Sequence, residues 1–487
     1  MRLRHLVPSV VAGLVVSGAF VAPADAATTT AADWTIANNA PMLADVARII
    51  RADTAYSQKL TGKGVGIALI DTGVVPVPGL TSGNIANGPD LSLESQVPSL
   101  LHKDGYGHGT HLAGIIAGRD NTTGTGFRGI APDAKLTVLK VGMSNGAVDV
   151  TQVMAAVDWV VKHRNDDPAN PIKIINLSYG TDGSQSFLSD PLSYAVGNAV
   201  NNGINVVVAA GNTGSKITNP ATAALPIVVG ASDPQGTTDP ADDKVSAFSS
   251  ADGRLISVDV LAPGRSIVSL RDPGGYADVL YPAARVGDRY FKGSGTSQAA
   301  AVMSGALALY LQKYPTATPL QVRQVIWGGI PSLTGKQWKL DVSTLLGRAP
   351  SLYGPVSISN SNASGTLQAA RGTSLVTFGD STTLSGERDV FGALSVASWA
   401  KASAARTSWN GGAWMGHTYT GAGWGTATAG QANWSGATWA GKSWSGRVWS
   451  DVAWSGRQWS NAGWSGTTSD FTGRQWSGGS WSGAIWQ

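Results

Sequence analysis

Five short apolar runs rich in valine and isoleucine place the strongest limit on how this 487-residue chain can fold. Strands that are apolar without alternation are typical of a parallel sheet that is covered by helices on both faces. The predicted α/β domain, a parallel sheet flanked by helices, spans residues 50–346. The apolar runs occupy 65–70, 136–141, 172–177, 205–210 and 227–229, and helical patterns occupy 108–117, 150–163, 192–201 and 297–313.

Three motifs in this region supply a carboxylate, an imidazole and a hydroxyl. They are Asp-Thr-Gly at 71–73, His-Gly-Thr-His at 108–111 and Gly-Thr-Ser at 295–297. A serine hydroxyl is a weak nucleophile that needs an adjacent base, which a third group must orient. Asp71 directly follows the first predicted strand, and active sites of open α/β sheets lie at the carboxyl ends of the strands. Two histidines this close could instead bind zinc, but no Glu or Cys stands beside them at a suitable spacing.

These motifs, in the order Asp, His, Ser, resemble the active-site signatures of the subtilisin-like serine peptidases, the subtilases. The resemblance covers about residues 50–345 and includes Gly-Ile-Ala-Pro at 129–132. It implies a subtilisin-like fold and a serine endopeptidase that forms an acyl-enzyme. In this mechanism Ser297 is the nucleophile, His108 transfers the proton, and Asp71 orients His108.

The same resemblance assigns residues to the binding of the peptide substrate. Asn212 matches the asparagine of the oxyanion hole, where its amide would act together with the backbone N–H of the nucleophile. The segment after the third predicted strand would pair with an extended substrate, although Tyr179 stands where a smaller aliphatic residue is common. The residues expected to bind substrate are Ser178, Tyr179, Gly180 and Gly211.

Three further features depart from the family pattern. Gln298 stands where the family usually has Met, and Ala301 stands where it usually has Pro. The calcium loop that usually precedes Gly-Ile-Ala-Pro here reads Asp-Asn-Thr-Thr-Gly at 120–124, without the usual ligand pattern. No cofactor is therefore expected to be required, and calcium held by Asp120 and Asn121 stays open as an alternative.

The N-terminus has the pattern of a signal peptide over residues 1–26: a basic start, an apolar run and small residues before the cleavage site. The apolar run is short for a membrane anchor and is interrupted by Pro and Gly. We therefore expect export, removal of the signal near Ala26, and a secreted protein without further membrane association. Residues 27–49 form a short N-terminal segment, too short for the large folding prodomain of many relatives. The chain has no cysteine, and a domain of roughly 300 residues can bury a sufficient core without disulfides.

The C-terminal part of the chain is a tryptophan repeat. Residues 347–395 are rich in Gly, Ser and Thr and are interpreted as a linker, and over much of 396–487 a tryptophan recurs every five residues, usually before Ser or Ala and then Gly. A fixed period indicates one structural unit per repeat, and five fits neither a helix nor a strand. We predict a β-rich or irregular array, for which a β-solenoid is one model. The alternative is a disordered tail, although such tails are poor in aromatic residues.

The charge of the chain adds a second hypothesis about function. The net charge of +4 lies in the tail, because residues 391–487 have six Lys or Arg and two Asp. Aromatic faces suit polysaccharides and basic residues suit an anionic cell wall, so the tail is expected to bind such a surface, beside the protein or peptide substrates of the domain. Nucleic acid is not expected as a partner, because the charge density is low. The alternative function is a cell-surface or cell-wall-binding protein with an idle protease-like domain.

Overall fold

A computed structural model describes most of the chain between residues 40 and 418. The predicted signal peptide and the segment 27–39 lie outside the described residues, as do Asn121 and nearly all of the repeat beyond residue 418. The predicted solenoid therefore lies outside them as well. The described residues are 40–96, 99–120, 126–251, 258–327, 339–351, 360–376 and 383–418, and the short strands at 438–439, 442–443 and 471–472.

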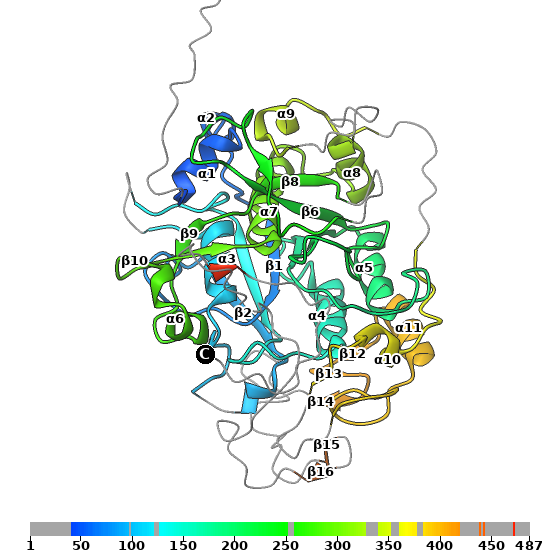
Figure 1. Cartoon of the computed structure of the whole chain (residues 1–487). Helices are drawn as coiled ribbons and strands as arrows, with labels where there is room; N and C mark the ends of the chain where they lie inside the picture. The colour runs from blue at the N-terminus through cyan, green and yellow to red at the C-terminus, as the bar shows by residue number, and fades with distance from the viewer. Residues whose placement is uncertain are drawn as a thin grey trace, which may run out of the picture. The chain divides into compact units, whose positions relative to one another are not determined.

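An eight-stranded sheet forms the centre of the domain (Figure 1). Its order is β2-β3-β1-β4-β5-β6-β7, with β8 also paired to β6, and only the pairing of β6 with β7 is antiparallel. The predicted parallel sheet is thus confirmed, and its five predicted strands correspond to β1, β3, β4, β5 and β6. The strands are β1 (Gly66–Asp71), β2 (Ile85–Asp90), β3 (Lys135–Lys140), β4 (Ile172–Leu177), β5 (Asn205–Ala209), β6 (Ile227–Asp233), β7 (Lys244–Val245) and β8 (Val260–Pro263).

Helices cover both faces of this sheet. Ile67 and Leu69 of β1 pack in the hydrophobic cluster of α3 and α7, whereas Ala68 and Ile70 pack in that of α4 and α5. Successive side chains of a strand point to opposite faces, so these two clusters define the two sides. The four helices are α3 (His108–Ala117), α4 (Val150–His163), α5 (Pro191–Asn201) and α7 (Thr296–Lys313).

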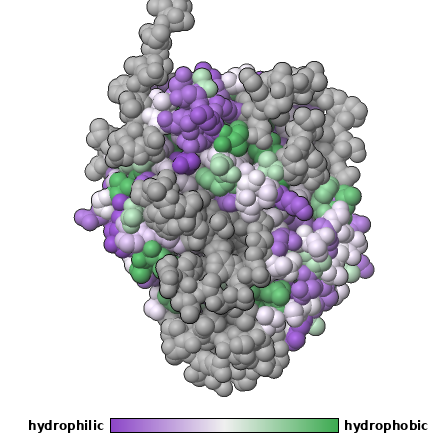
Figure 2. Space-filling view, viewed as in Figure 1, coloured by the Kyte–Doolittle hydropathy of each residue, from purple (hydrophilic) through white to green (hydrophobic). Residues whose placement is uncertain are grey.

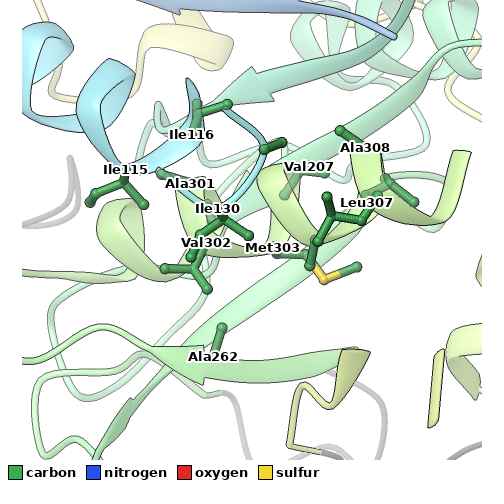
Figure 3. Packing of buried hydrophobic residues seen from close by; sticks show 14 of the residues in the cluster. Ile115, Ile116, Ile130, Val207, Ala262, Ala301, Val302, Met303, Leu307 and Ala308 are labelled. Carbon is green, nitrogen blue, oxygen red and sulfur yellow. The ribbon is translucent and has the colours of Figure 1, made fainter. Parts of the chain in front are cut away.

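Helix α7 lies inside the core along almost its whole length, since every residue from Thr296 to Leu311 is buried. In Figure 3, Val302 and Met303 of α7 lie among side chains from the sheet and from α3, including Val207 and Ile116. A helix that is apolar on all sides is typical of the interior of a large domain. The packing of α7 therefore fixes the position of its first turn.

The remaining elements lie around this centre. A second sheet has β11 in its middle, with β9 and β10 antiparallel to it and β17 parallel. The other helices of the domain are α1 (Leu43–Ile49), α2 (Asp53–Ser57), α6 (Tyr276–Leu280), α8 (Pro319–Trp327) and α9 (Val342–Leu346), with 3₁₀ turns η2 (Leu93–Gln96) and η3 (Pro282–Ala284). The strands of the second sheet are β9 (Ile267–Leu270), β10 (Arg285–Val286), β11 (Tyr290–Ser294) and β17 (Phe471–Thr472).

The stretch interpreted as a linker, 347–395, differs from that expectation in its described residues. Helix α10 (Leu367–Arg371) and the chain that follows it pack beside α4 and α5 (Figure 1), and Leu367, Leu384 and Val390 are buried in the same hydrophobic cluster. A linker would leave these side chains in water. The apolar residues of this stretch are spaced too irregularly to show a helix or strand period. The sequence pattern therefore did not reveal that the stretch is packed.

The first tryptophans of the repeat also belong to this packed region. Trp399, Trp409 and Trp414 are buried against α4, where the indole N–H groups of Trp399 and Trp414 both donate to Asp158 at 2.8 and 2.9 Å. The elements here are α11 (Val396–Ala404), β12 (Trp409–Asn410), β13 (Ala413–Trp414) and β14 (His417–Thr418); farther along, β15 (Thr438–Trp439) pairs with β16 (Lys442–Ser443).

The surface of the described residues is mixed in character. On the face drawn in Figure 2 the hydrophobic residues form small, separate patches between hydrophilic ones. Within the described ranges, no helix combines the length and the apolar character needed to span a membrane. The large hydrophobic side chains that are exposed are Leu188, Val245, Val279 and Leu280.

Candidate active site

Asp71 and His108 are in direct contact at the carboxyl edge of the sheet. Asp71 is the last residue of β1 and His108 is the first residue of α3, and both side chains are buried. His108 Nδ1 lies 2.8 Å from Asp71 Oδ1. A carboxylate only accepts hydrogen bonds, so Nδ1 donates, and the lone pair of the neutral ring is then on Nε2. The imidazole is thus oriented as a general base requires.

A third residue, Asp104, holds the two segments together. Its Oδ1 accepts from the backbone N–H of Gly107 at 2.7 Å and from the Thr72 hydroxyl at 2.9 Å, and its Oδ2 accepts from the backbone N–H of Thr110 at 2.8 Å. The Thr72 hydroxyl in turn accepts from the backbone N–H of Gly109 at 2.9 Å. Asp104 was not predicted from the sequence. The feature that could have indicated it is an Asp four residues before a helix that begins at a functional histidine.

His111 lies one turn after His108 and has a different environment. Its Nε2 lies 3.1 Å from the carbonyl oxygen of Phe291, to which it donates. Burial lowers the pKa of His111 to about 4, and the charge of His108 adds to the lowering. His111 is therefore neutral near pH 7 and joins α3 to β11.

Ser297 is the second residue of α7, and Asn212 is bound to the residue before it. The Asn212 Oδ1 atom accepts from the backbone N–H and the hydroxyl of Thr296, at 2.8 and 2.9 Å. The Thr296 hydroxyl accepts from the backbone N–H of Gly211 at 3.0 Å. A Cβ placed on Gly295 would lie 3.1 Å from Asn212 Nδ2. The amide nitrogen of Asn212 is thus turned toward the main chain that carries Ser297.

The other residues expected to bind substrate follow the neighbouring strands. Ser178, Tyr179 and Gly180 come directly after β4, and Gly211 comes shortly after β5, which is paired with β4. Because β1, β4 and β5 are adjacent and parallel, these residues reach the same edge of the sheet as Asp71. The Tyr179 side chain is only 1% exposed and packs in the hydrophobic cluster of α4 and α5, so only its backbone can face a substrate.

Asp120, considered above as a calcium ligand, has another partner. It forms an ion pair with Arg289, and Oδ2 also accepts from the backbone N–H of Phe127 at 2.7 Å. The hydrogen bond with Arg289 lowers the pKa of Asp120. Asp120 is thus held by Arg289 and by the main chain of Phe127, and Asn121, the other residue considered for calcium, lies outside the described residues.

Another buried carboxyl group, that of Asp272, lies beside the start of α3. A Cβ placed on Gly107 would lie 3.6 Å from Asp272 Cβ, and Asp272 Oδ2 has no hydrogen-bond partner among the described residues. The pKa of Asp272 is raised to about 8, mainly by burial and also by the negative charge of Asp104.

This pKa makes the stability of the fold depend on pH. In the unfolded chain an Asp loses its proton near pH 4, whereas folded Asp272 keeps it up to about pH 8. Stability therefore falls as the pH rises between these values. The test compares Asp272→Asn with the unmodified Asp272, both in a Ser297→Ala background that prevents self-digestion. From pH 5 to pH 9 the unfolding free energy of Asp272→Asn relative to that of Asp272 should rise by about 2–4 kcal/mol, measured by denaturant titration.

The exposed Asp288 provides the matched control, because Asp288→Asn removes a carboxylate from the surface of the same region. Its effect on unfolding should be the same at both pH values. An equal effect of Asp272→Asn at pH 5 and pH 9 would contradict the raised pKa.

Comparison with known proteins identifies the class of this domain. Residues 62–338 match the model of the subtilase family. Serine protease AprX of Bacillus subtilis (strain 168) is 36% identical over 314 residues, which are 63% of this chain and 67% of AprX. Subtilisin DY of Bacillus licheniformis is 34% identical over 281 residues, which are 56% of this chain and 86% of that protein.

A solved structure agrees with these sequence relatives. The crystal structure of fervidolysin from Fervidobacterium pennivorans, a keratinolytic enzyme related to subtilisin, superposes with a TM-score of 0.51 at 26% identity. The match covers 64% of this chain and 47% of that chain. The chain belongs to the subtilase family, and its α/β domain is a subtilisin-like serine endopeptidase.

Proposed function

We propose that the protein is a secreted endopeptidase that hydrolyses peptide bonds with Ser297, His108 and Asp71. The observation that carries the proposal is the 2.8 Å contact between His108 Nδ1 and Asp71 Oδ1. His108 Nε2 takes the proton of Ser297 as the hydroxyl attacks the peptide carbonyl, and returns it to the leaving amine. Asp71 stabilises the imidazolium between these steps, and water then releases the acyl group.

The negative oxygen of the tetrahedral intermediate needs donors that are already in place. We assign this role to Asn212 Nδ2 and to the backbone N–H of Ser297. The hydrogen bonds from Thr296 to Asn212 Oδ1 support the assignment, because they fix the orientation of the amide and leave its Nδ2 end to donate to the oxyanion. The substrate would lie extended along residues 178–180 and pair with their main chain.

The two ends of the Asn212 amide can be tested separately. Asn212→Asp keeps the oxygen that accepts from Thr296 but removes the N–H donor. We expect kcat to fall by about 10²–10³-fold with little change in KM, since the donor acts only on the intermediate. Steady-state kinetics on a peptide anilide would measure this.

Asn201→Asp, on the exposed surface of α5, makes the same chemical change away from the site. It should leave kcat unaltered. A kcat for Asn212→Asp within threefold of that of the unmodified enzyme would argue against the assigned donor.

The proposed nucleophile is tested by covalent labelling. A phosphonylating reagent specific for activated serines should react once with the folded protein, and mass spectrometry of the digest should place the group on Ser297. A label found only at other residues would exclude this mechanism.

We also propose that the signal peptide is removed near Ala26 and that the repeat beyond residue 418 binds cell wall or polysaccharide. The tryptophan content supports the proposed binding through the repeat. Trp399, Trp409 and Trp414 are buried in the core, but eleven further tryptophans follow them in the repeat. Mass spectrometry of the secreted protein would locate its N-terminus. Pull-down with insoluble cell wall should retain the full chain and lose a variant with Trp444, Trp449 and Trp454 all replaced by alanine; equal retention would count against binding through the repeat.

A further inference from the structure

The proposed substrate segment, 178–180, continues into residues 181–185, which lie against a part of the chain almost two hundred positions away. We call this part, residues 366–373, the supporting segment; it contains α10. It lies outside the region that matches the subtilase family. Hydrogen bonds join it to Thr181, Asp182, Ser184 and Gln185.

The shortest of these bonds involve the residues nearest the substrate segment. The Thr181 hydroxyl donates to the carbonyl oxygen of Ala370 at 2.5 Å. Asp182 accepts from the backbone N–H of Thr373 at 2.9 Å and from its hydroxyl at 2.6 Å. On its other side, the backbone N–H of Thr181 donates to the carbonyl oxygen of Asn219 at 2.8 Å. The position of Thr181, one residue after the substrate segment, is thus fixed from two sides.

Glycines let the two backbones come this close. A Cβ on Gly183 would lie 2.9 Å from the carbonyl oxygen of Ala369. A Cβ on Gly372 would lie 2.6 Å from the carbonyl oxygen of Asp182, and Gly372 has a φ of 59°. Larger residues at either position would push the supporting segment away from residues 181–185.

Arg371 anchors the supporting segment in the domain. Its side chain is fully buried, with Nε 2.6 Å from Asp149 Oδ2 and Nη1 2.6 Å from the carbonyl oxygen of Gly386. Asp149 is also the N-cap of α4. Burial by itself lowers the pKa of Arg371, but the charge and hydrogen bond of Asp149 raise it, and the net shift is upward. The guanidinium therefore holds the supporting segment against the start of α4.

We propose that the supporting segment positions the substrate segment for extended peptides, with Arg371 as its positioning residue. The proposal rests on the substrate-binding role of residues 178–180 given above. A main-chain edge can align a peptide only if it is held in place before the peptide arrives, and a displacement of about 1 Å can cost up to about 10²-fold in rate. A region outside the family match would thereby contribute to substrate binding.

The test compares two substrates that use the site differently. A tetrapeptide anilide needs the substrate segment, whereas p-nitrophenyl acetate needs only the reacting groups. Thr181→Val keeps the shape of the side chain and removes the bond to Ala370, and Arg371→Met keeps the buried stem without the charge. For both variants we expect kcat/KM on the tetrapeptide to fall about tenfold, mainly through KM, with acetate hydrolysis unchanged.

Thr407→Val is the control, because this exposed hydroxyl also donates to a main-chain carbonyl, that of Ala402, but far from residues 181–185. It should change neither activity. A lower melting temperature with an unaltered ratio of the two activities would overturn the proposal and leave the supporting segment a role in stability alone. If Arg371→Met does not fold, Thr181→Val decides by itself. A failure of the proposed function would give a different result from a failure of this proposal. In that case the unmodified protein would neither hydrolyse p-nitrophenyl acetate nor be labelled at Ser297.

Discussion

Replacing Ser297 with alanine is expected to lower kcat for peptide hydrolysis by about 10⁶-fold. The variant keeps the fold and the oxyanion donors, because the hydroxyl of Ser297 is not needed to hold α7 in the core. It loses the only group proposed to form the acyl-enzyme, so the residual rate comes from binding and from the oxyanion hole. KM should change little. Hydrolysis of a peptide anilide by purified protein, followed for many hours, measures the effect.

The control for this variant lies on the same helix. Ser304 is buried two turns along α7, and its hydroxyl donates to Asn176 Oδ1 at 2.9 Å. Ser304→Ala should reduce stability by about 1 kcal/mol and leave kcat within a few-fold. Substantial peptidase activity in Ser297→Ala, with Ser304→Ala equally active, would remove Ser297 from the mechanism.

The central sheet and its helices could be predicted because their signal is local. The runs at 65–70 and 172–177 are continuously apolar, and the structure has strands at these places. By contrast, β2 has the sequence Ile-Ala-Asn-Gly-Pro-Asp, whose last four residues disfavour strands, so no propensity argument finds it. It forms because β3 beside it offers free hydrogen-bonding groups at the edge of the sheet.

In the candidate site, too, some residues could be predicted from local sequence signals and others could not. The contact of Asp71 with His108 follows from a strand end and a helix start, both of which were visible in the sequence. Asp104 and Asp272 were missed, because the bond of Asp104 to Thr72 and the burial of Asp272 arise only when segments far apart in the chain approach each other. The supporting segment was missed for a further reason. The ion pair of Arg371 with Asp149 joins residues more than two hundred positions apart, and a periodic sequence pattern cannot predict such a pair.

The packing of the first tail tryptophans leads to the second large expected effect. Asp158 is buried on α4, and besides the two indole N–H groups it accepts from the Ser403 hydroxyl at 2.6 Å. Burial raises the pKa of Asp158, while the hydrogen bonds from Ser403, Trp414 and Trp399 oppose the rise. One carboxylate thus satisfies three buried donors that come from residues 399–414.

Asp158→Ala should reduce the free energy of unfolding by about 3–5 kcal/mol, because each buried donor left without a partner costs about 1–3 kcal/mol. A domain is stable by only about 5–15 kcal/mol, so residues 396–418 should separate from α4 at denaturant concentrations that leave the sheet intact. Denaturant titration in a Ser297→Ala background would show this as an early red shift of tryptophan fluorescence. The shift should precede the loss of far-ultraviolet circular dichroism.

Asp166, just beyond the end of α4, gives the comparison. Its side chain is 68% exposed and pairs with His163, so Asp166→Ala should change stability by about 0.5 kcal/mol or less. A similarly small effect of Asp158→Ala, with no early fluorescence change, would mean that apolar packing of the indoles holds residues 396–418 without the carboxylate. An early, separate transition would instead show that this single side chain decides whether the beginning of the tryptophan repeat belongs to the catalytic domain.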